Sequence, residues 1–334
     1  MTSMEAKSGW LAITAVAPIA WGANYVVTRQ LLPADALLWG SALRALPAGL
    51  VLLPLARALP RGRQWWQSAV LAVLNVSGFF ALVYASAQLL PSSIASSVMA
   101  LSPLVLILLA WPLTSERPTV RALTGGAVGA AALVVVLGGT GWAIDPVGVL
   151  AALAALVSSS VGALLGKRWS AGTPVLASTA WQLTLGGLML TAAAAIGGPP
   201  PALDLRAGLG FAFTSLVATA LAYLCWFGGL KHLRAAQVGA LGMLNPVTGV
   251  LLGTLAARES LTGVQLAGIV VVLAAVGWST VRPRLTVRDN PARAAAGRGG
   301  RCSAPGSRWW RPRTRGSRAD RGSRRSPSLP RPSR

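Results

Sequence analysis

Long apolar runs separated by short polar connections fill residues 10–280 of this 334-residue chain. Each run holds roughly 18–22 mainly hydrophobic residues, the length that a helix needs to cross a hydrocarbon core. Because backbone polar groups in lipid must be satisfied within the spanning segment, we expect helices. The pattern predicts an all-α membrane protein with ten transmembrane helices, at Trp10–Thr28, Ala36–Leu55, Gln67–Gln88, Ser93–Leu113, Val120–Gly139, Val147–Gly166, Pro174–Ile196, Ala207–Leu230, Ala235–Leu255 and Val264–Thr280.

Two of these runs repeat one pattern at a spacing of 143 residues. ALSPLVLILLAWPLTSERPT, which starts at Ala100, aligns without a gap with MLNPVTGVLLGTLAARESLT, which starts at Met243. The alignment places Pro103 on Pro246 and Glu116 on Glu259. The two copies are the fourth and ninth predicted spans, so they cross the membrane in opposite directions. The repeat therefore predicts two inverted five-helix halves, an arrangement that many secondary transporters use for alternating access.

The charges of the connections predict the orientation, because cytoplasmic loops carry an excess of Lys and Arg. With the N-terminus inside, ten basic residues lie on the cytoplasmic side: Lys7, Arg57, Arg61, Arg63, Arg117, Arg121, Lys167, Arg168, Lys231 and Arg234. Only three lie on the opposite side, Arg29, Arg206 and Arg258, together with Asp35, Asp145, Asp204 and Glu259. We therefore expect cytoplasmic N- and C-termini and an uncleaved first span, since its apolar run is longer than that of a signal peptide.

Composition separates a membrane body from a basic tail. The chain is 54% hydrophobic and 11% charged, with a mean hydropathy of +0.59, as is typical of polytopic membrane proteins. Of the net charge of +22, the stretch from Arg282 onward supplies +14, with sixteen Arg and two Asp. We expect a cytoplasmic N-terminus at 1–9, helical halves at 10–139 and 140–282, and a disordered Arg/Ser/Pro/Gly-rich tail at 283–334.

The positive charge of the tail indicates that it is attracted to anionic lipid headgroups. Its charge would suit nucleic acid equally well, but no recognition fold accompanies it, so no specific nucleic-acid partner is expected. A non-homologous extension of the reading frame is a third interpretation. Elsewhere, two cysteines and one histidine give no disulfide framework and no metal-ligand spacing, so no metal or cofactor is expected. The predicted spans also lack an intramembrane acid pair or nucleophile motif, which argues against an enzyme.

Arg44 is the one basic residue well inside a predicted span. An arginine near the bilayer centre costs roughly 2.5–3.5 kcal/mol on insertion scales, so it usually faces a partner or an aqueous cavity. If Arg44 lines a cavity, it favours solutes with a carboxylate or phosphate. The alternatives are snorkelling toward the outer interface or bonding to backbone carbonyls of a neighbouring helix.

Polar and aromatic residues within the spans complete the candidate site. The cavity candidates besides Arg44 are Asn24, Tyr25, Trp39, Asn75, Tyr84, Gln88, Ser102, Trp181, Gln182, Tyr223, Trp226 and Asn245. Amides and hydroxyls in an apolar pocket orient amphipathic molecules. Interhelical hydrogen bonding is the other interpretation of each polar residue.

The repeated prolines and glutamates suggest moving parts. Pro103 and Pro246 interrupt a helical ladder in mid-span, which suggests hinges or cavity-lining elements. Glu116 and Glu259 lie at helix ends, where they either serve as a gate or end the helix and pair with nearby arginines. The G-x-x-x-G spacings, such as Gly249/Gly253, favour close packing within the bundle and give no basis for a dimer. A homodimer is left open as a partner on other grounds.

Four segments resemble the EamA-type drug/metabolite transporter family: WGANYVVTRQLLP from Trp21, ALRALPAGL from Ala42, SSIASSVMALSPL from Ser92 and LNPVTGVLLGTLAARESLTGVQLAGIVVVL from Leu244. The resemblance covers residues 10 to about 282 and leaves out the tail. It implies a ten-helix inverted-repeat transporter of the inner or plasma membrane that moves small organic metabolites, often outward. The rival interpretation is a non-transporting membrane scaffold or sensor whose basic tail binds lipid or a partner.

Overall fold

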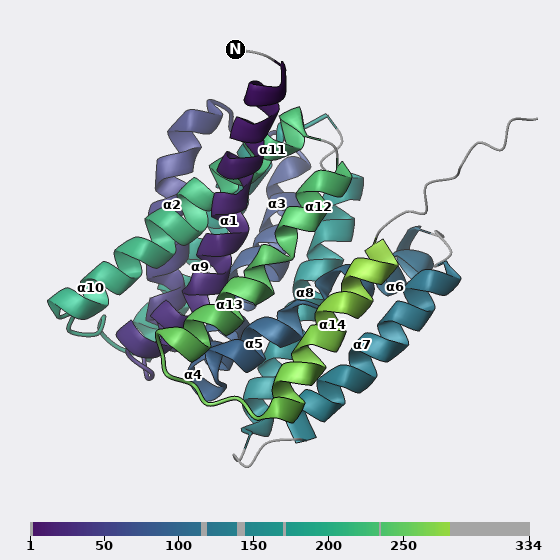
Figure 1. Ribbon diagram of the computed structural model, residues 1–334. Coiled ribbons are helices and arrows are strands. Elements are labelled where there is room, and N and C mark those ends of the chain that lie inside the picture. Colours follow the sequence, from purple (N-terminus) through teal and green to yellow (C-terminus); the bar gives the residue numbers. More distant parts are fainter. Residues whose placement is uncertain (1–2, 115–118, 139–143, 170–171, 234, 281–334) are drawn as a thin grey trace, which may run out of the picture. The chain divides into compact units, whose positions relative to one another are not determined.

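The computed structural model describes residues 3–114, 119–138, 144–169, 172–233 and 235–280, where all regular structure is helical (Figure 1). Seven helices there are long and apolar enough to cross a membrane, and three shorter apolar helices lie at Leu123–Leu137, Leu244–Leu255 and Gly263–Trp278. The expectation of an all-helical, multi-pass chain is thereby confirmed. Glu116 and the tail at 283–334 lie outside the described residues.

The helices follow one another in the order α1 (Ser3–Leu31), α2 (Leu37–Ala56), α3 (Gln64–Ala72), α4 (Gly78–Leu89), α5 (Ser92–Met99), α6 (Ser102–Thr114), α7 (Val120–Gly138), α8 (Pro146–Trp169), α9 (Val175–Gly197), α10 (Leu205–Ala212), α11 (Ala222–His232), α12 (Ala235–Gly242), α13 (Leu244–Leu255) and α14 (Gly263–Thr280). Two π-helical segments, η1 (Val73–Ser77) and η2 (Phe213–Leu221), join α3 to α4 and α10 to α11. Each of the ten predicted ranges falls on one of these helices or on a consecutive run of them.

The fourth and ninth predicted ranges are each split into two helices. The regular helix is interrupted by a turn at Ala100 and Leu101 between α5 and α6, and at Met243 between α12 and α13, although Ala100 and Met243 keep α-helical dihedral angles. The sequence predicted the prolines in the middle of single helices, whereas Pro103 and Pro246 lie in the first turns of α6 and α13. In a first turn the missing N–H leaves no helical hydrogen bond unmade, so the new helix can start there without strain.

Hydroxyl groups satisfy carbonyls in the π-helical segments. Ser77 Oγ donates to the Ala72 carbonyl at 3.1 Å, and Thr219 Oγ1 donates to the Thr214 carbonyl at 2.8 Å, each five residues back. A π turn widens the helix and loosens its ladder, so a side-chain donor replaces a backbone one. The wide turn of η2 holds the Thr219 side chain in the interior, where it is fully buried.

Caps and prolines set the starts of several helices. Asp145 Oδ1 accepts from the Val147 N–H at 2.7 Å at the start of α8, and Asp204 Oδ1 accepts from the Ala207 N–H at 2.7 Å at the start of α10. Pro91 precedes α5, and its carbonyl accepts from the N–H groups of Ile94 and Ala95. These residues occupy the first-turn positions where acceptors and prolines are favoured.

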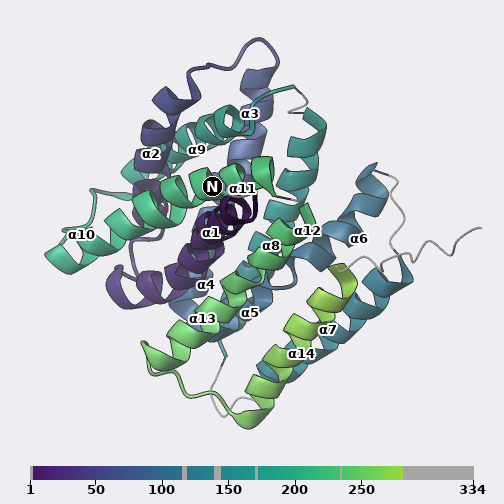
Figure 2. The ribbon, with the colours of Figure 1, turned by 45° about the horizontal axis from the view of Figure 1, so that its top comes forward.

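Small residues let the helices approach closely. The most extensive contacts join α2 to α9 and α7 to α14, pairs that lie side by side in Figures 1 and 2. Gly187 of α9 lies against the backbone of Leu46 on α2, and Gly49 of α2 lies against Thr184 on α9, so neither position has room for a Cβ atom. Because lipid gives no hydrophobic drive between helices, such close packing is a main source of their association.

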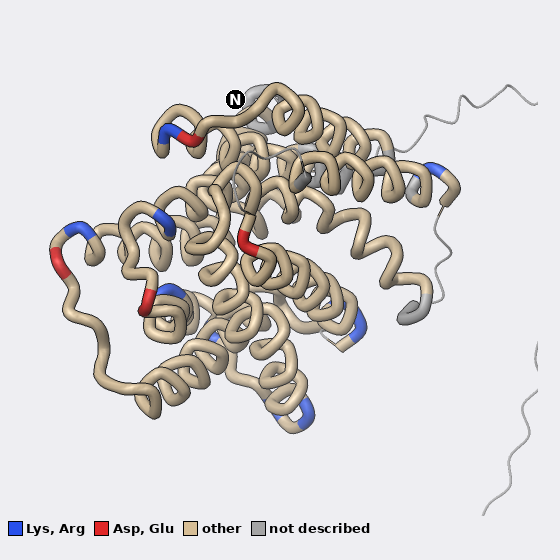
Figure 3. Tube along the Cα trace, turned by 90° about the horizontal axis from the view of Figure 1, so that it is seen from below, with Lys and Arg blue, Asp and Glu red and all other residues tan. Residues whose placement is uncertain are grey.

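The charged residues of the described part lie mostly at helix ends and in connections (Figure 3). This distribution keeps the charges close to water and leaves the middle of most helices apolar. Arg44 is the exception, because it is the eighth residue of the 20-residue helix α2. We therefore expect the functional site to lie around Arg44.

Candidate functional site

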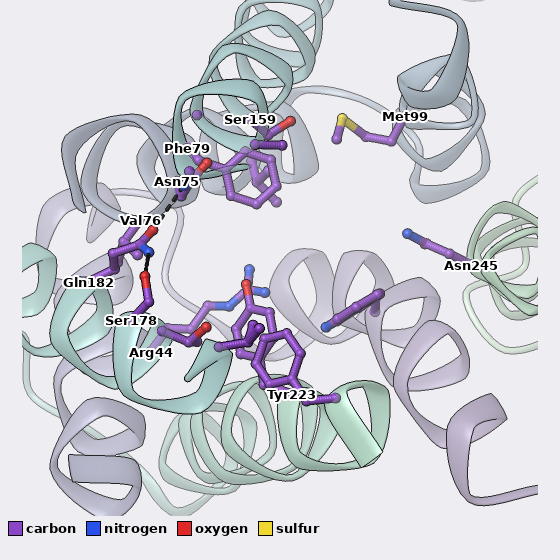
Figure 4. A pocket seen from close by; sticks show the side chains of 18 of the residues that line it. Arg44, Asn75, Val76, Phe79, Met99, Ser159, Ser178, Gln182, Tyr223 and Asn245 are labelled. Carbon is purple, nitrogen blue, oxygen red and sulfur yellow. Dashed lines mark hydrogen bonds between the residues drawn. The ribbon is translucent and has the colours of Figure 1, made fainter. Parts of the chain in front are cut away.

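A cavity of about 670 Å³ lies among helices that come from both halves of the chain. Its wall includes residues of α1, α2, η1, α4, α5, α8, α9, α11 and α13 (Figure 4). A volume of this size suits a small organic molecule. The cavity therefore combines segments that are far apart in sequence into one site of ligand size.

Seven of the thirteen sequence-predicted cavity residues line this space: Asn24, Tyr25, Arg44, Asn75, Gln182, Tyr223 and Asn245. The cavity also has aromatic and hydroxyl-bearing lining that the sequence analysis did not single out: Trp21, Phe79, Phe227, Ser159, Ser178, Thr173 and Thr179. Several of these residues lie one helical turn from a residue that the sequence predicted. Trp21 and Asn24 precede Tyr25 on one face of α1, and Phe227 follows Tyr223 by one turn on α11.

The remaining six predicted residues lie elsewhere. Five of them donate a hydrogen bond to a backbone carbonyl: Trp39 to Gly198, Tyr84 to Pro33, Gln88 to Thr28 and Leu32, Ser102 to Met99, and Trp181 to Ala58. Trp226 packs against Trp21, with their ring centroids 5.2 Å apart. Ser102 bonds to a carbonyl three residues back in its own segment. The other four residues each join a helix to a carbonyl of another helix or connection.

Arg44 lines the cavity, and two specific contacts hold its side chain in place. Its Nε donates to Thr219 Oγ1 at 3.2 Å, and its Cζ lies 4.1 Å from the centroid of the Phe80 ring. In the described part of the chain no carboxylate forms an ion pair with it. Neither alternative from the sequence, snorkelling or bonding to backbone carbonyls, describes this environment. Cation–π attraction and one hydroxyl offset only part of the cost of holding the charge inside the bundle.

A chain of amides and a hydroxyl crosses one wall of the cavity. Asn75 Nδ2 donates to Gln182 Oε1 at 2.8 Å, and Gln182 Nε2 donates to Ser178 Oγ at 2.9 Å (Figure 4). Gly162 of α8 lies against the Asn75 side chain, where a Cβ atom would collide with it. The network fixes the polar groups of this wall and joins η1 to α9.

Two other lining residues, Asn24 and Asn245, have side-chain oxygens that accept no hydrogen bond from the described residues. Asn24 Oδ1 and Asn245 Oδ1 are buried and have no hydrogen-bond partner among the described residues. The two asparagines come from α1 and α13, which pack against each other where Gly22 lies on the Asn245 carbonyl. Buried polar atoms in native proteins are nearly always satisfied, so two orphaned carbonyl oxygens beside one cavity call for an explanation.

One end of the bundle is closed by hydrogen bonds between α1, α4, α5 and the segment after α13. Glu259 accepts from the N–H groups of Ser92 at 2.6 Å and Ser93 at 3.0 Å, and from Ser93 Oγ at 2.6 Å. Arg29 donates to the carbonyls of Gln88 and Leu90. Instead of pairing with an arginine, the Glu259 carboxylate caps the start of α5, where the helix dipole favours an anion.

The cavity extends toward the other end of the bundle. Its lining there includes Gly166 and Lys167 at the end of α8, Thr173 and Val175 at the start of α9, and Leu230 near the end of α11. The two ends of the molecule are therefore unlike. Polar contacts close the end that carries Glu259, and the cavity reaches toward the end that carries Lys167.

The EamA-like transporter family matches residues 8–138 and 146–281 of the chain. Protein PecM of Dickeya dadantii is 34% identical over 263 residues, which cover 78% of this chain and 88% of PecM. A probable amino-acid metabolite efflux pump of Salmonella typhimurium is 28% identical over 290 residues, covering 81% of this chain and 94% of the pump.

An uncharacterized inner membrane transporter of Escherichia coli, YedA, is 25% identical over 264 residues, covering 77% of this chain and 86% of YedA. A protein of known crystal structure shares the fold with a TM-score of 0.58 at 20% identity. That match covers 82% of this chain and 96% of the other.

Cysteine substitutions at two neighbouring serines of α8 test whether the cavity is open to water. Ser159 lines the cavity, whereas Ser160 is buried with its hydroxyl on the Leu156 carbonyl. In a background without Cys225 and Cys302, we expect Ser159→Cys to react rapidly with a water-soluble maleimide and Ser160→Cys to react slowly. The rates are measured on purified protein by mass shift. Equal rates at the two positions would contradict an aqueous cavity.

Proposed function

The chain belongs to the EamA-like transporter family, and we propose that it is a secondary active transporter that exports small organic metabolites, such as amino acids or drug-like amphiphiles, by alternating access. Membership of this family shows that the chain is a multi-pass transporter of the inner membrane. The observation that carries the proposal is a ligand-sized cavity between the two halves that is closed toward one end and extends toward the other.

Equivalent irregularities in the two halves support an inverted repeat with halves at 10–139 and 140–282. At the offset of 143, the break after Met99 falls on the break after Gly242, and the end of α4 falls on the end of α11. Each half also holds one π-helical segment in its third predicted span. The packing has the same symmetry, since α1 contacts α11 and α13 as α8 contacts α4 and α6. Two halves with matching contacts can exchange conformations, which is the basis of alternating access.

The charge of the connections supports an inward-facing arrangement. Lys167 and Lys231 belong to the end that the positive-inside count assigns to the cytoplasm, and Arg29 and Glu259 to the outer end. The cavity extends toward the first of these ends. An exporter loads its solute from the cytoplasm, so this arrangement suits the loading step.

The outer contacts of Glu259 and Arg29 then act as a gate. Releasing the solute outward requires α5 to separate from the segment after α13, which breaks the hydrogen bonds from Ser92 and Ser93 to Glu259. The helix breaks before Pro103 and Pro246 lie directly beside the cavity residues Met99 and Asn245, so they are suited to act as hinges. Glu116 is the sequence equivalent of Glu259 and would serve the inner end in the same way.

The name of one relative, an amino-acid metabolite efflux pump, supports both the outward direction and the solute class. Membrane lipids are the further expected partners, with anionic headgroups at the basic tail. The rival interpretation, a scaffold or sensor that works through its tail, predicts that residues 283–334 are essential and that no solute moves.

Counterflow in liposomes tests the proposal. We expect purified protein to exchange radiolabelled amino acid across vesicles preloaded with the same unlabelled solute, and we expect a chain truncated after Arg282 to retain that exchange. Protein-free vesicles and vesicles with heat-denatured protein serve as controls. An absence of exchange across neutral, acidic and aromatic amino acids, with folded protein verified by gel filtration, would count against a transporter of this class.

Replacing Glu259 tests the gate. Hydrogen bonds to a charged group contribute about 1.5–3 kcal/mol and neutral ones about 0.5–1.5 kcal/mol, so Glu259→Gln weakens the closed outer end by about 1–2 kcal/mol. We expect a several-fold shift toward the outward-open state, measured as slower labelling of Ser159→Cys from the cytoplasmic side.

Asp204→Asn is the matched control, because Asp204 caps its own helix at the same end without joining α5 to α13. It should lower stability slightly and leave the labelling rate unchanged. A Glu259→Gln variant with the labelling rate of the parent would refute the gate.

A further inference from the structure

We propose that the cavity recognises the carboxylate of its solute through Arg44, and that the solute is a monoanionic or zwitterionic organic acid with an apolar body. This inference rests on the proposed transport function and narrows its solute class. Three observations carry it: the uncompensated charge of Arg44, the geometry of its guanidinium, and the composition of the rest of the wall.

The charge of Arg44 has no counterpart of opposite sign among the described residues. It lies in the apolar bundle, yet no Asp or Glu of the described residues forms an ion pair with it. The described lining of the cavity holds two basic residues, Arg44 and Lys167, and no acidic one. An isolated cation in a low-dielectric interior is costly, and an anion that enters the cavity removes that cost. The cavity is thus electrostatically incomplete until an anion occupies it.

The guanidinium is held so that its donors remain available. A guanidinium has five N–H donors, and among the described residues only the donor on Nε has an acceptor, Thr219 Oγ1. Its Cζ lies 4.1 Å from the centroid of the Phe80 ring, a contact that leaves the N–H groups at the edge of the guanidinium free to donate elsewhere. Figure 4 shows the group extending into the open space beside Tyr223. The remaining N–H groups form the fork that binds a carboxylate through two parallel hydrogen bonds.

The rest of the wall selects the remainder of the solute. Trp21, Phe79, Tyr223 and Phe227 give an apolar and aromatic surface for its body. Asn24 and Asn245 also line the cavity and add amide groups to its wall, although their Oδ1 atoms are themselves buried. An organic acid with a large apolar body, such as an amino acid with a large apolar side chain, matches the guanidinium of Arg44 and this aromatic surface.

The same wall argues against two other solute classes. An organic cation would meet Arg44 and Lys167 with no lining carboxylate to hold its charge. A phosphate dianion usually gathers several basic groups, whereas a single arginine stands at the centre here. One central cation suits one negative charge.

Binding of a matched series of phenyl compounds tests the inference, measured by isothermal titration on protein in nanodiscs. The probes are L-phenylalanine, phenylacetate, L-phenylalaninamide, phenethylamine and phenyl phosphate. We expect the two carboxylates, phenylalanine and phenylacetate, to bind most tightly, with the amide and the amine at least about tenfold weaker. Equal or tighter binding of the amide or amine, tighter binding of phenyl phosphate than of phenylacetate, or no binding by any probe would overturn the inference.

Variants of Arg44 locate the effect. Arg44→Gln should weaken phenylalanine and phenylacetate by about tenfold or more and leave the amide unchanged, while Arg44→Lys should give an intermediate loss, because it keeps the charge and loses the fork. Arg206→Gln, at the exposed start of α10, is the matched control and should bind as the parent does. Unchanged affinity for the carboxylates in both Arg44 variants would overturn the assignment, and the probe series tests it in the parent protein even if a variant does not fold.

Failure of this inference is distinguishable from failure of the transport function. Counterflow of neutral or cationic solutes without carboxylate binding would preserve the transporter and refute the Arg44 site. Carboxylate binding that depends on Arg44 without any counterflow would preserve the site and refute transport.

Discussion

A hydrocarbon interior offers no water to a polar group, so each such group in this bundle must find its partner within the protein. Backbone groups meet the requirement by forming helices, and side chains meet it by bonding to carbonyls. Trp181 reaches the carbonyl of Ala58, and Thr219 reaches that of Thr214 inside a π-helical segment. Among the described residues, some buried polar atoms do not meet this requirement. The Oδ1 atoms of Asn24 and Asn245 have no partner, and both residues line the cavity together with Arg44, whereas the unpartnered atoms of Ser92, Arg121 and Ser215 belong to residues outside its lining.

The same requirement explains why the two ends of the bundle differ. At the end with Glu259, side chains satisfy the free backbone groups where helices start and stop: Glu259 takes the first N–H groups of α5, and Arg29 takes carbonyls near the end of α4. Toward the end with Lys167 the cavity separates α8, α9 and α11. Under the proposed inverted repeat, this difference between the two ends is the asymmetry that alternating access requires.

Much of the architecture could be predicted from the sequence because it depends on local patterns. Apolar run lengths located the helices, and the repeat located the two interruptions in the fourth and ninth ranges. The π-helical segments were not predicted, since their sequences have no distinctive period. For the site, polarity within a span identified Asn24, Arg44 and Tyr223 as candidates but could not say which way each residue faces. Trp39 and Gln88 satisfy carbonyls of distant connections instead, and the partners of Glu259 lie 166 and 167 residues away.

The central claim is that the two ends open in turn, and paired spin-label distances test it most directly. One pair, at Leu89 of α4 and Leu255 of α13, spans the closed end, and a second pair, at Val175 of α9 and Leu230 of α11, spans the other; all four side chains are exposed. Double electron–electron resonance should show two populations in each pair. Solute or the Glu259→Gln substitution should lengthen the first distance while shortening the second. Distances that stay single and unchanged, or that change in the same direction at both ends, would contradict the account.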